Sequence, residues 1–393
     1  MDSSHPAAPL PSLARGTSFG GAAIPEVSVI IPARNEEANL AACLESLAAQ
    51  TGVRFEIIVV DDGSTDRTRE IAQSFAGVQV ISPSPLPENC RGENCRGKTR
   101  TGKNNALIAG AKQARSPRLL FTDADTAHQP GSLARALAEA KKEQSDLLSY
   151  SPRQVVITFA ERAVMPVIFA ELAAQYPPHK VRDQNSEIVA ANGQYILVRR
   201  AAYDAVGGHA AVASEILEDV ALARLFRNAG YRVHFRYAAD AVRTRMYRSW
   251  AQLREGWTKN LALLFPHPEF LAFKTVLWWF AAWAALFFAL TASAGYHHLS
   301  LIFSAVWLLA FLRISTARFA PQNTLLALTI GPPIFAYLLL RSKQAHAQGR
   351  VSWKGRVYDT AVRNDNDNDN DRDVKQPAKS ISRIEERDLR TEN

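Results

Sequence analysis

The chain has 393 residues, a formal net charge of +8 and a sequence pI of about 9.4. It is long enough to bury a sizeable core and to hold more than one domain, while its three cysteines are too few for a disulfide framework and favour a reducing compartment. The positive charge favours an anionic partner, but phosphates, lipid head groups and nucleic acid all satisfy that condition, so charge alone selects none of them.

The N-terminal segment, residues 1–25, is rich in Pro, Ser, Ala and Gly. It has no basic stretch followed by an apolar run, which a signal peptide would need. We expect a flexible lead without a signal peptide.

Short apolar runs alternate with segments of helical spacing from residue 27 to residue 125. The predicted strands are 27–33, 56–62, 78–82 and 118–125, and the predicted helices are 36–50, 66–76 and 103–114. This alternation predicts a mainly parallel sheet with helices on both faces. Ligands of such sheets bind at the carboxyl ends of the strands.

Polar clusters follow three of these strands, as Arg34-Asn35-Glu36, as the run DDGSTD (61–66) and as Thr122-Asp123-Ala124-Asp125-Thr126. Any one cluster is also explained as a turn or a helix cap. Three clusters at one sheet edge crowd carboxylates together, and a cation or a hydrogen-bonding ligand would offset the repulsion. Asp123 and Asp125 suit Mg²⁺ or Mn²⁺, because these ions prefer oxygen ligands and accept phosphates in the remaining positions.

Five segments occur in the order VSVIIPARNEE, IIVVDDGSTDRT, GKNNAL, FTDADT and EILEDVALARLFRNAGYRV. Together they resemble inverting family 2 glycosyltransferases with a GT-A fold, over residues 26–265. The later MYRSWAQLREGWTKN and the apolar C-terminal third resemble the membrane-bound members that glycosylate lipids, including those associated with hopanoids and carotenoids. The resemblance implies a nucleotide-sugar donor (UDP- or GDP-sugar), a lipid acceptor and a membrane as partners, and no nucleic acid.

The resemblance also gives donor-side roles to individual residues. Ala33, Asn35 and Glu36 would line the nucleoside pocket, and Asp62 would contact the base. Asp123 would lie near the ribose, and Asp125, with Asp123, would bind the Mg²⁺ or Mn²⁺ that bridges the diphosphate. Lys103 would contact the donor phosphates.

On the acceptor side, the resemblance matches Asp219 of the pair Glu218-Asp219 to the catalytic base, and Gly193 to a small residue that begins an acceptor-side strand. In-line displacement at the anomeric carbon needs a base opposite the departing diphosphate. Without the resemblance, Glu218 and Asp219 are explained as acidic residues that favour the start of a helix.

The segment LREGWTKN (253–260) stands where processive members carry Gln-x-x-Arg-Trp. Trp257 remains, with Arg254 and Lys259 as candidate phosphate partners, so we expect one sugar per acceptor. The alternative is an amphipathic helix whose Trp257 lies at a bilayer interface.

A tandem copy of ENCRG fills residues 88–97 and runs into a near match to a nucleotide-binding P-loop. The motif lacks its final hydroxyl, because Asn104 stands at the Ser/Thr position, and a proline-rich segment precedes it in place of a strand. Cys90 and Cys95 lack the further ligands of a structural zinc site. We interpret the copy as a lengthened loop near the donor diphosphate.

The C-terminal third predicts a membrane region of two to three helices within residues 270–341. Residues 275–312 contain no Asp, Glu, Lys or Arg, and a second uncharged stretch, 319–340, is interrupted by Gly331-Pro332-Pro333. Crossing the hydrocarbon takes about 20 residues. We expect a multi-pass protein of the inner membrane whose catalytic domain is cytosolic.

The basic juxtamembrane segment 342–362 favours a cytosolic C-terminal side. Three crossings would place it outside, so either 319–340 is re-entrant or an extra segment such as 159–176 lies in the interface. The tail 363–393, with its alternating Asn and Asp, predicts disorder.

Two other functional classes stay open on sequence alone. One is a P-loop NTPase, and the other is a non-catalytic membrane scaffold with a degenerate glycosyltransferase fold. The presence of Asp62, Asp123, Asp125 and Asp219 argues against the scaffold.

Overall fold

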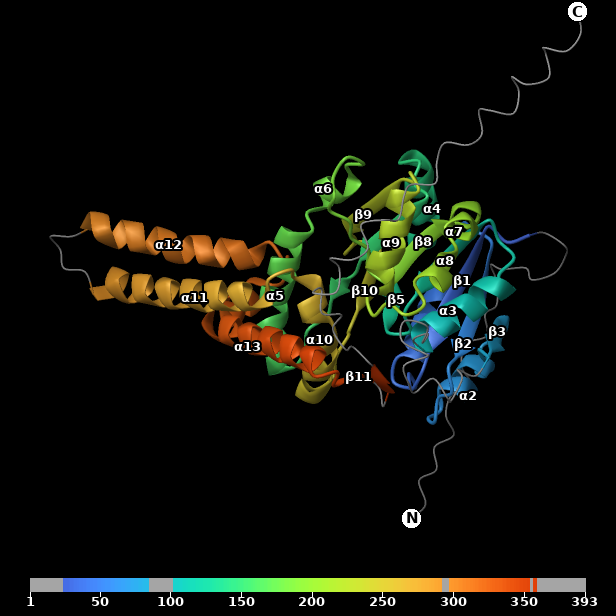
Figure 1. Cartoon of the computed structure of the whole chain (residues 1–393), viewed down its shortest axis with the longest axis horizontal. Coiled ribbons are helices and arrows are strands. Elements are labelled where there is room, and N and C mark those ends of the chain that lie inside the picture. Colours follow the sequence, from blue (N-terminus) through green and yellow to red (C-terminus); the bar gives the residue numbers. More distant parts are fainter. Residues whose placement is uncertain (1–23, 85–101, 292–296, 354–355, 359–393) are drawn as a thin grey trace, which may run out of the picture.

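The computed structural model describes residues 24–84, 102–291, 297–353 and 356–358. An α/β body holds the first two thirds of these residues, and a bundle of long helices extends from one side of it (Figure 1). The ENCRG copy and the C-terminal tail lie outside the described residues, so the predictions made for them stay predictions, as do the domain boundaries.

Within the described residues, seven strands form the main sheet in the order β3-β2-β1-β4-β8-β6-β9. Their bounds are β1 Val27–Ala33, β2 Phe55–Asp61, β3 Val78–Ile81, β4 Arg118–Thr122, β6 Leu147–Ser151, β8 Tyr195–Arg199 and β9 Val233–Tyr237. The β8 strand runs antiparallel to β4 and β6, whereas the other neighbours are parallel. The mainly parallel sheet predicted from the alternation is therefore confirmed.

A smaller sheet orders β5 (Thr126–His128), β10 (Val242–Thr244) and β7 (Arg153–Gln154) beside the carboxyl end of β4. The predicted strand 118–125 ends earlier, at Thr122. Asp123 and Asp125 therefore stand in the tight connection to β5 and not within a strand.

Helices cover both faces of the main sheet. Residues of α1 (Leu40–Ala48), α2 (Thr68–Ser74) and α4 (Ser132–Lys142) join one core cluster, and residues of α3 (Gly102–Gln113), α7 (Arg200–Ala205) and α9 (Glu218–Asn228) join the other. The β1 strand serves both clusters because successive side chains alternate faces: Val29 belongs to the first and Ile30 to the second. A Cβ on Gly110 of α3 would lie 2.4 Å from Ile30 Cγ2, so glycine permits the close approach of α3 to the sheet.

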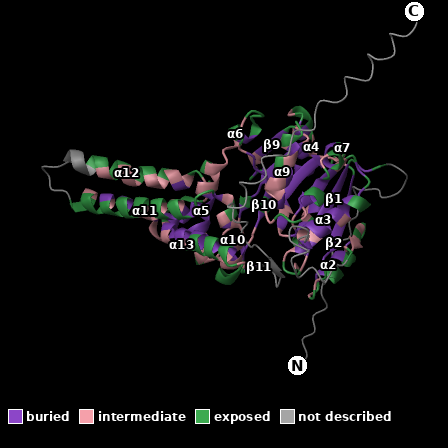
Figure 2. Cartoon of the chain, viewed as in Figure 1, coloured by how far each residue is buried: buried purple, intermediate pink, exposed green. Residues whose placement is uncertain are grey.

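The helical extension combines α5 (Phe159–Gln175), α10 (Trp250–Leu264), α11 (Pro268–Thr291), α12 (His297–Ser315) and α13 (Pro321–Ala347) around a third core cluster. Within the described residues, α11 and α13 are long and apolar enough to cross a membrane by length and composition, and Leu301–Ser315 is a shorter apolar helix. Much of α11 and α12 is exposed (Figure 2), whereas α13 is half-buried against its neighbours.

The predicted interruption at Gly331-Pro332-Pro333 is wrong, because α13 runs through it as one helix. Proline lacks an N–H, so Pro333 leaves the carbonyl of Thr329, four residues earlier, without its helical donor. The indole Nε1 of Trp279 on α11 donates to that carbonyl at 2.9 Å. A tertiary contact thus compensates for the local defect.

The segment 159–176 forms α5 but does not lie flat as an exposed interfacial helix. Its residues 163–170 are buried, and α5 packs against α13 and α10. The shorter elements α6 (Pro178–Arg182), α8 (Gly208–Ala211) and the hairpin of β11 (Val351–Trp353) and β12 (Arg356–Tyr358) complete the described chain.

Candidate active site

A cavity of about 320 Å³ lies where the carboxyl ends of β1, β2 and β4 meet α9, α10 and α5. Eleven of the residues predicted from the sequence to act in the site line it: Ala33, Glu36, Asp62, Lys103, Asp123, Asp125, Gly193, Glu218, Asp219, Trp257 and Lys259. These residues are distributed over 227 positions of the sequence, from 33 to 259, and the fold brings them to one cavity.

Asn35 and Arg254 are not among the residues that line this cavity. Asn35 has a φ of 51° and joins the loops after β1 and β2. Its backbone N–H donates to Ser64 Oγ at 3.0 Å, and its side-chain Oδ1 accepts from the N–H of Thr65 at 2.9 Å. Asn35 therefore holds the loops after β1 and β2 together.

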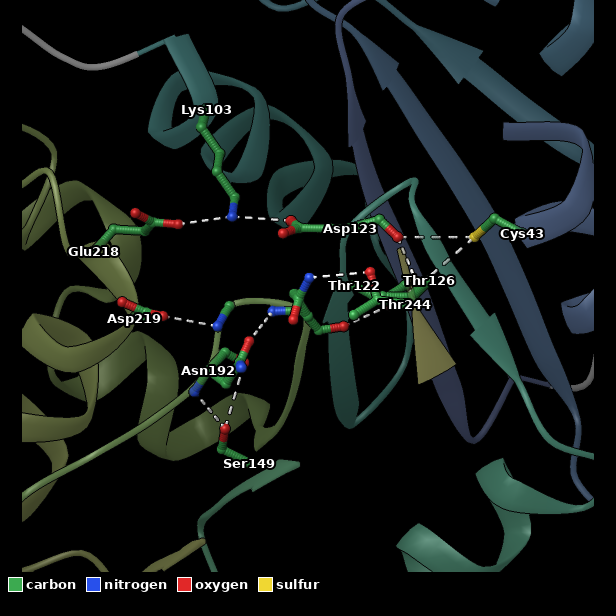
Figure 3. Close-up of polar contacts among 12 residues, drawn as sticks. Cys43, Lys103, Thr122, Asp123, Thr126, Ser149, Asn192, Glu218, Asp219 and Thr244 are labelled. Atoms are coloured by element: carbon green, nitrogen blue, oxygen red, sulfur yellow. Dashed lines mark hydrogen bonds and ion pairs between the residues drawn. The ribbon is translucent and has the colours of Figure 1, made fainter. Parts of the chain in front are cut away.

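Lys103, near the start of α3, lies between Asp123 and Glu218 (Figure 3). Its Nζ lies 2.9 Å from Asp123 Oδ1 and 2.9 Å from Glu218 Oε1. Burial alone would lower the pKa of Lys103, but the two carboxylates outweigh it and raise that pKa well above its usual range. Lys103 is therefore a fixed positive charge between the sheet edge and α9.

Asp219 is held by backbone donors and not by Lys103. Its Oδ2 accepts from the N–H of Gly193 at 2.8 Å, and its Oδ1 accepts from the N–H of Val220 at 2.8 Å. A Cβ on Gly193 would lie 3.1 Å from Lys103 Nζ and 3.5 Å from Asp219 Oδ2. The small residue at this position lets the backbone approach both charged groups.

The two neighbouring acids of α9 have opposite electrostatic environments. Burial, assisted by the negative charge of Glu218, raises the pKa of Asp219 to about 6. Burial also acts to raise the pKa of Glu218, but the positive charges of Lys103 and Lys259 outweigh it and lower that pKa. Asp219 is thus the more basic carboxylate of the pair, and Glu218 is the partner of Lys103.

Asp123 and Asp125 both face the cavity and offer carboxylate oxygens from one short loop. Among the described residues, no group of three or more His, Cys, Asp or Glu side chains is placed to hold a metal ion by itself. A two-carboxylate donor set suits Mg²⁺ or Mn²⁺ when substrate phosphates complete the shell. The residues present therefore fit a metal that arrives together with a diphosphate.

Apolar side chains also line the cavity. Its wall includes Phe169 and Leu172 of α5, Met246, and Trp257 and Leu264 of α10. The apolar bulk and few charges of residues 159–176 predicted an interfacial segment beside the acceptor groove; in the structure the segment packs against α10 and α13, and its side chains line the cavity.

Trp257 is 3% exposed, and its Nε1 donates to Met165 Sδ at 3.4 Å. The alternative that places Trp257 at a bilayer interface is therefore wrong. Lys259, one of two candidate phosphate partners in the same segment, does line the cavity, and burial lowers its pKa.

Part of the chain matches a family model, and most of its length is similar to curated proteins. Residues 28–207 match the family model described as Glycosyl transferase family 2. The 4,4'-diaponeurosporenoate glycosyltransferase of Staphylococcus aureus (strain MRSA252) is 29% identical over 351 residues, which cover 84% of this chain and 88% of that protein. The corresponding protein of strain USA300 is 29% identical over 348 residues, with the same coverage of both chains.

Two solved structures are also similar. One is the mannosyltransferase PcManGT from Pyrobaculum calidifontis in complex with GDP-Man and Mn²⁺, with 18% identity, a TM-score of 0.45 and coverage of 87% of this chain and 90% of that one. The other is S. aureus TarS 1-349 in complex with UDP-GlcNAc, with 17% identity, a TM-score of 0.38 and coverage of 83% and 92%.

The protein is a glycosyltransferase with the GT-A fold. The residues that match the Glycosyl transferase family 2 model, 28–207, include most of β1, all of β2 to β4, the acidic loops and β8. The alternatives of a P-loop NTPase and of a non-catalytic scaffold are not favoured by these findings.

Proposed function

We propose that the protein transfers a single sugar from a UDP- or GDP-sugar to a lipid acceptor, with inversion and with the help of Mg²⁺ or Mn²⁺. The observation that carries the proposal is the arrangement of one cavity around Asp219. The same cavity is lined by acidic and basic side chains at the strand ends and on α3, by apolar and aromatic side chains of α5 and α10, and by Asp219.

The polar side chains of the lining suit the donor. Ala33 ends β1, and Glu36 and Asp62 follow β1 and β2, where an α/β sheet binds nucleotides. Asp123 and Asp125 would hold the metal, which supplies positive charge to the departing diphosphate. Lys103 would add a second positive charge next to the same phosphates, since it already lies against Asp123.

Asp219 acts as the base in this proposal. Its two backbone hydrogen bonds hold the carboxylate in place, and a pKa of about 6 leaves it ionised at neutral pH yet basic enough to accept a proton from an acceptor hydroxyl. Glu218 has a different role, because its ion pair with Lys103 keeps that carboxylate ionised and occupied.

Two observations support a lipid acceptor beside the apolar side chains of α5 and α10 that line the cavity. The S. aureus relative is named for an apolar carotenoid acid, and the alignment with it covers 84% of this chain. The apolar wall is built by α5 and α10, which pack against α13, a helix long and apolar enough to cross a membrane. We therefore place the protein in the inner membrane as a multi-pass protein with its catalytic domain on the cytosolic side.

The decisive experiment gives detergent-solubilised protein a panel of labelled UDP- and GDP-sugars and lipid acceptors, with Mn²⁺, Mg²⁺ or EDTA. We expect one sugar-acceptor pair to yield a singly glycosylated product of inverted anomeric configuration, and EDTA to abolish its formation. Full activity in EDTA, or in Asp125→Asn, would remove the metal from the mechanism.

The matched pair Asp219→Asn and Glu218→Gln tests the base. Loss of a general base costs 10²- to 10⁴-fold, or about 3–5 kcal/mol of barrier, so Asp219→Asn should bind nucleoside diphosphate almost normally and transfer almost nothing. Glu218→Gln should be milder. If Glu218→Gln transfers no sugar while Asp219→Asn is fully active, Glu218 is the base and Asp219 is not.

A further inference from the structure

A hydroxyl of α13 is inserted into the backbone of α10. In a regular helix the carbonyl of Thr258 accepts from the N–H of Ala262, four residues later. In this structure the Ser342 hydroxyl donates to the Thr258 carbonyl at 2.7 Å and accepts from the Ala262 N–H at 2.9 Å. Ser342 is fully buried, so it bridges the two backbone groups without competition from water. A side chain inserted at such a pair alters the local path of a helix.

A second residue of α13 holds the same segment. His346 lies four residues after Ser342, on the same helix face, and its Nε2 donates to the carbonyl of Lys259 at 2.8 Å. The α13 helix thus contacts the backbone of α10 at three positions within one and a half turns, Thr258, Lys259 and Ala262.

The side chains of this α10 segment line the active site. Trp257, Lys259 and Asn260 are all on the cavity wall. Burial is the main cause that lowers the pKa of Lys259. The charges of Glu218, Lys103 and Asp219 also act on that pKa, so the ammonium group of Lys259 lies close enough to the acids of α9 to interact with them. The backbone of the segment is therefore bonded to α13, while side chains of the same segment line the cavity.

The same α13 helix also contacts α5, which supplies the rest of the apolar wall. A Cβ on Gly331 would lie only 2.4 Å from the backbone oxygen of Ala163, so the two helices approach closely there. The α5 and α10 helices are joined directly as well, because the Tyr176 hydroxyl donates to the carbonyl of Leu264 at 2.6 Å. The donor-side carboxylates, in contrast, stand on loops that follow β1, β2 and β4.

We propose that Ser342 and His346 of α13 are positioning residues for the acceptor site: they hold α10 so that Trp257, Lys259 and Asn260 face the acceptor. A helix suited to the membrane then acts as part of the acceptor-binding structure and not only as an anchor. The proposal rests on the proposed function in one respect, namely that the lipid binds beside the apolar side chains of α5 and α10 that line the cavity.

The kinetic test compares Ser342→Ala with two controls in full-length protein in detergent. In Ser315→Ala the lost hydroxyl donates to the carbonyl of Phe311 within its own helix, α12. Leu338→Ala shortens a fully buried side chain of α13 and lowers stability without removing a bond to α10. Ser342→Ala should raise the KM for the lipid acceptor about tenfold and leave donor hydrolysis by water within twofold of the parent, and neither control should show this split.

An acceptor KM in Ser342→Ala equal to that of the parent would overturn the proposal. So would a parallel loss of donor hydrolysis and transfer that Leu338→Ala reproduces, because that pattern shows only weakened folding.

Hydrogen exchange of the amides of residues 257–264, measured without any substrate, separates this inference from the proposed function. Faster exchange there in Ser342→Ala than in Ser315→Ala supports the coupling of α13 to α10, and unchanged exchange overturns it. If the parent glycosylates no lipid in the panel, the proposed function fails, and the exchange experiment still decides whether α13 holds α10.

Discussion

At the scale of single residues, the environment of Asp219 sets a pH dependence. Burial and the neighbouring charge of Glu218 raise its pKa to about 6, so the carboxyl is protonated below that pH and cannot accept a proton, and it is ionised above it. We expect kcat/KM for transfer to rise between pH 5 and pH 7 with a midpoint near pH 6, measured with a saturating donor. In Glu218→Gln the midpoint should move to lower pH, because one negative charge beside Asp219 is lost. A profile that is flat from pH 5 to pH 8 would contradict the assignment.

Also at this scale, Lys103 compensates two carboxylates that the fold brings close together. Removing one member of a buried ion pair costs about 3–5 kcal/mol, and the 31% exposure of the Lys103 side chain reduces the expected cost to about 2 kcal/mol. Lys103→Met should therefore lower the free energy of unfolding by about 2 kcal/mol in urea titrations in detergent. In a Glu218→Gln background the same substitution should cost less, because one of the two carboxylates is already neutral. If the losses of unfolding free energy in the two single variants add up to the loss in the double variant, Lys103 and Glu218 do not interact.

At the scale of elements, the packing of α13 on α5 depends on Gly331. A methyl group there would lie 2.4 Å from the backbone oxygen of Ala163 and 2.7 Å from Val167 Cγ2, and a helix backbone cannot give way as a side chain can. Overpacking typically costs about 1–3 kcal/mol, so Gly331→Ala should lower the free energy of unfolding by that amount. Leu340→Ala, an exposed position on the same helix, should change it by less than about 0.5 kcal/mol. Equal effects would mean that α13 and α5 are not closely packed.

At the scale of the whole molecule, the exposed apolar surface of α11 and α12 predicts how the protein partitions between membrane and soluble fractions. Phe273, Leu277 and Phe280 lie on one face of α11, and all three are exposed. Large contiguous apolar surfaces mark contacts with membranes or partner proteins, and α11 is long enough to cross the hydrocarbon. We expect the protein to stay with membranes through alkaline carbonate washing and to leave them only in detergent. Release by salt alone would assign the helices to a peripheral or soluble assembly.

The sequence by itself determined the local elements and the kind of chemistry. Alternating apolar runs predicted β1 to β4 and the helices between them, because side-chain periodicity is a local property. The acidic loops after β1, β2 and β4 predicted a ligand site, because carboxyl ends of parallel strands share one edge. Glu36, Asp62, Asp123 and Asp125 line one cavity for that reason.

Only the tertiary structure decided which of these groups touch. The ion pairs of Lys103 with Asp123 and Glu218 join residues up to 115 positions apart, and no local pattern encodes such a contact. Three further results have the same origin: the burial of Trp257, the continuity of α13 through two prolines, and the insertion of Ser342 into α10. Each depends on a partner from another helix that satisfies a polar group or excludes water, so the packing of helices distant in sequence, and not the local sequence, settles the outcome.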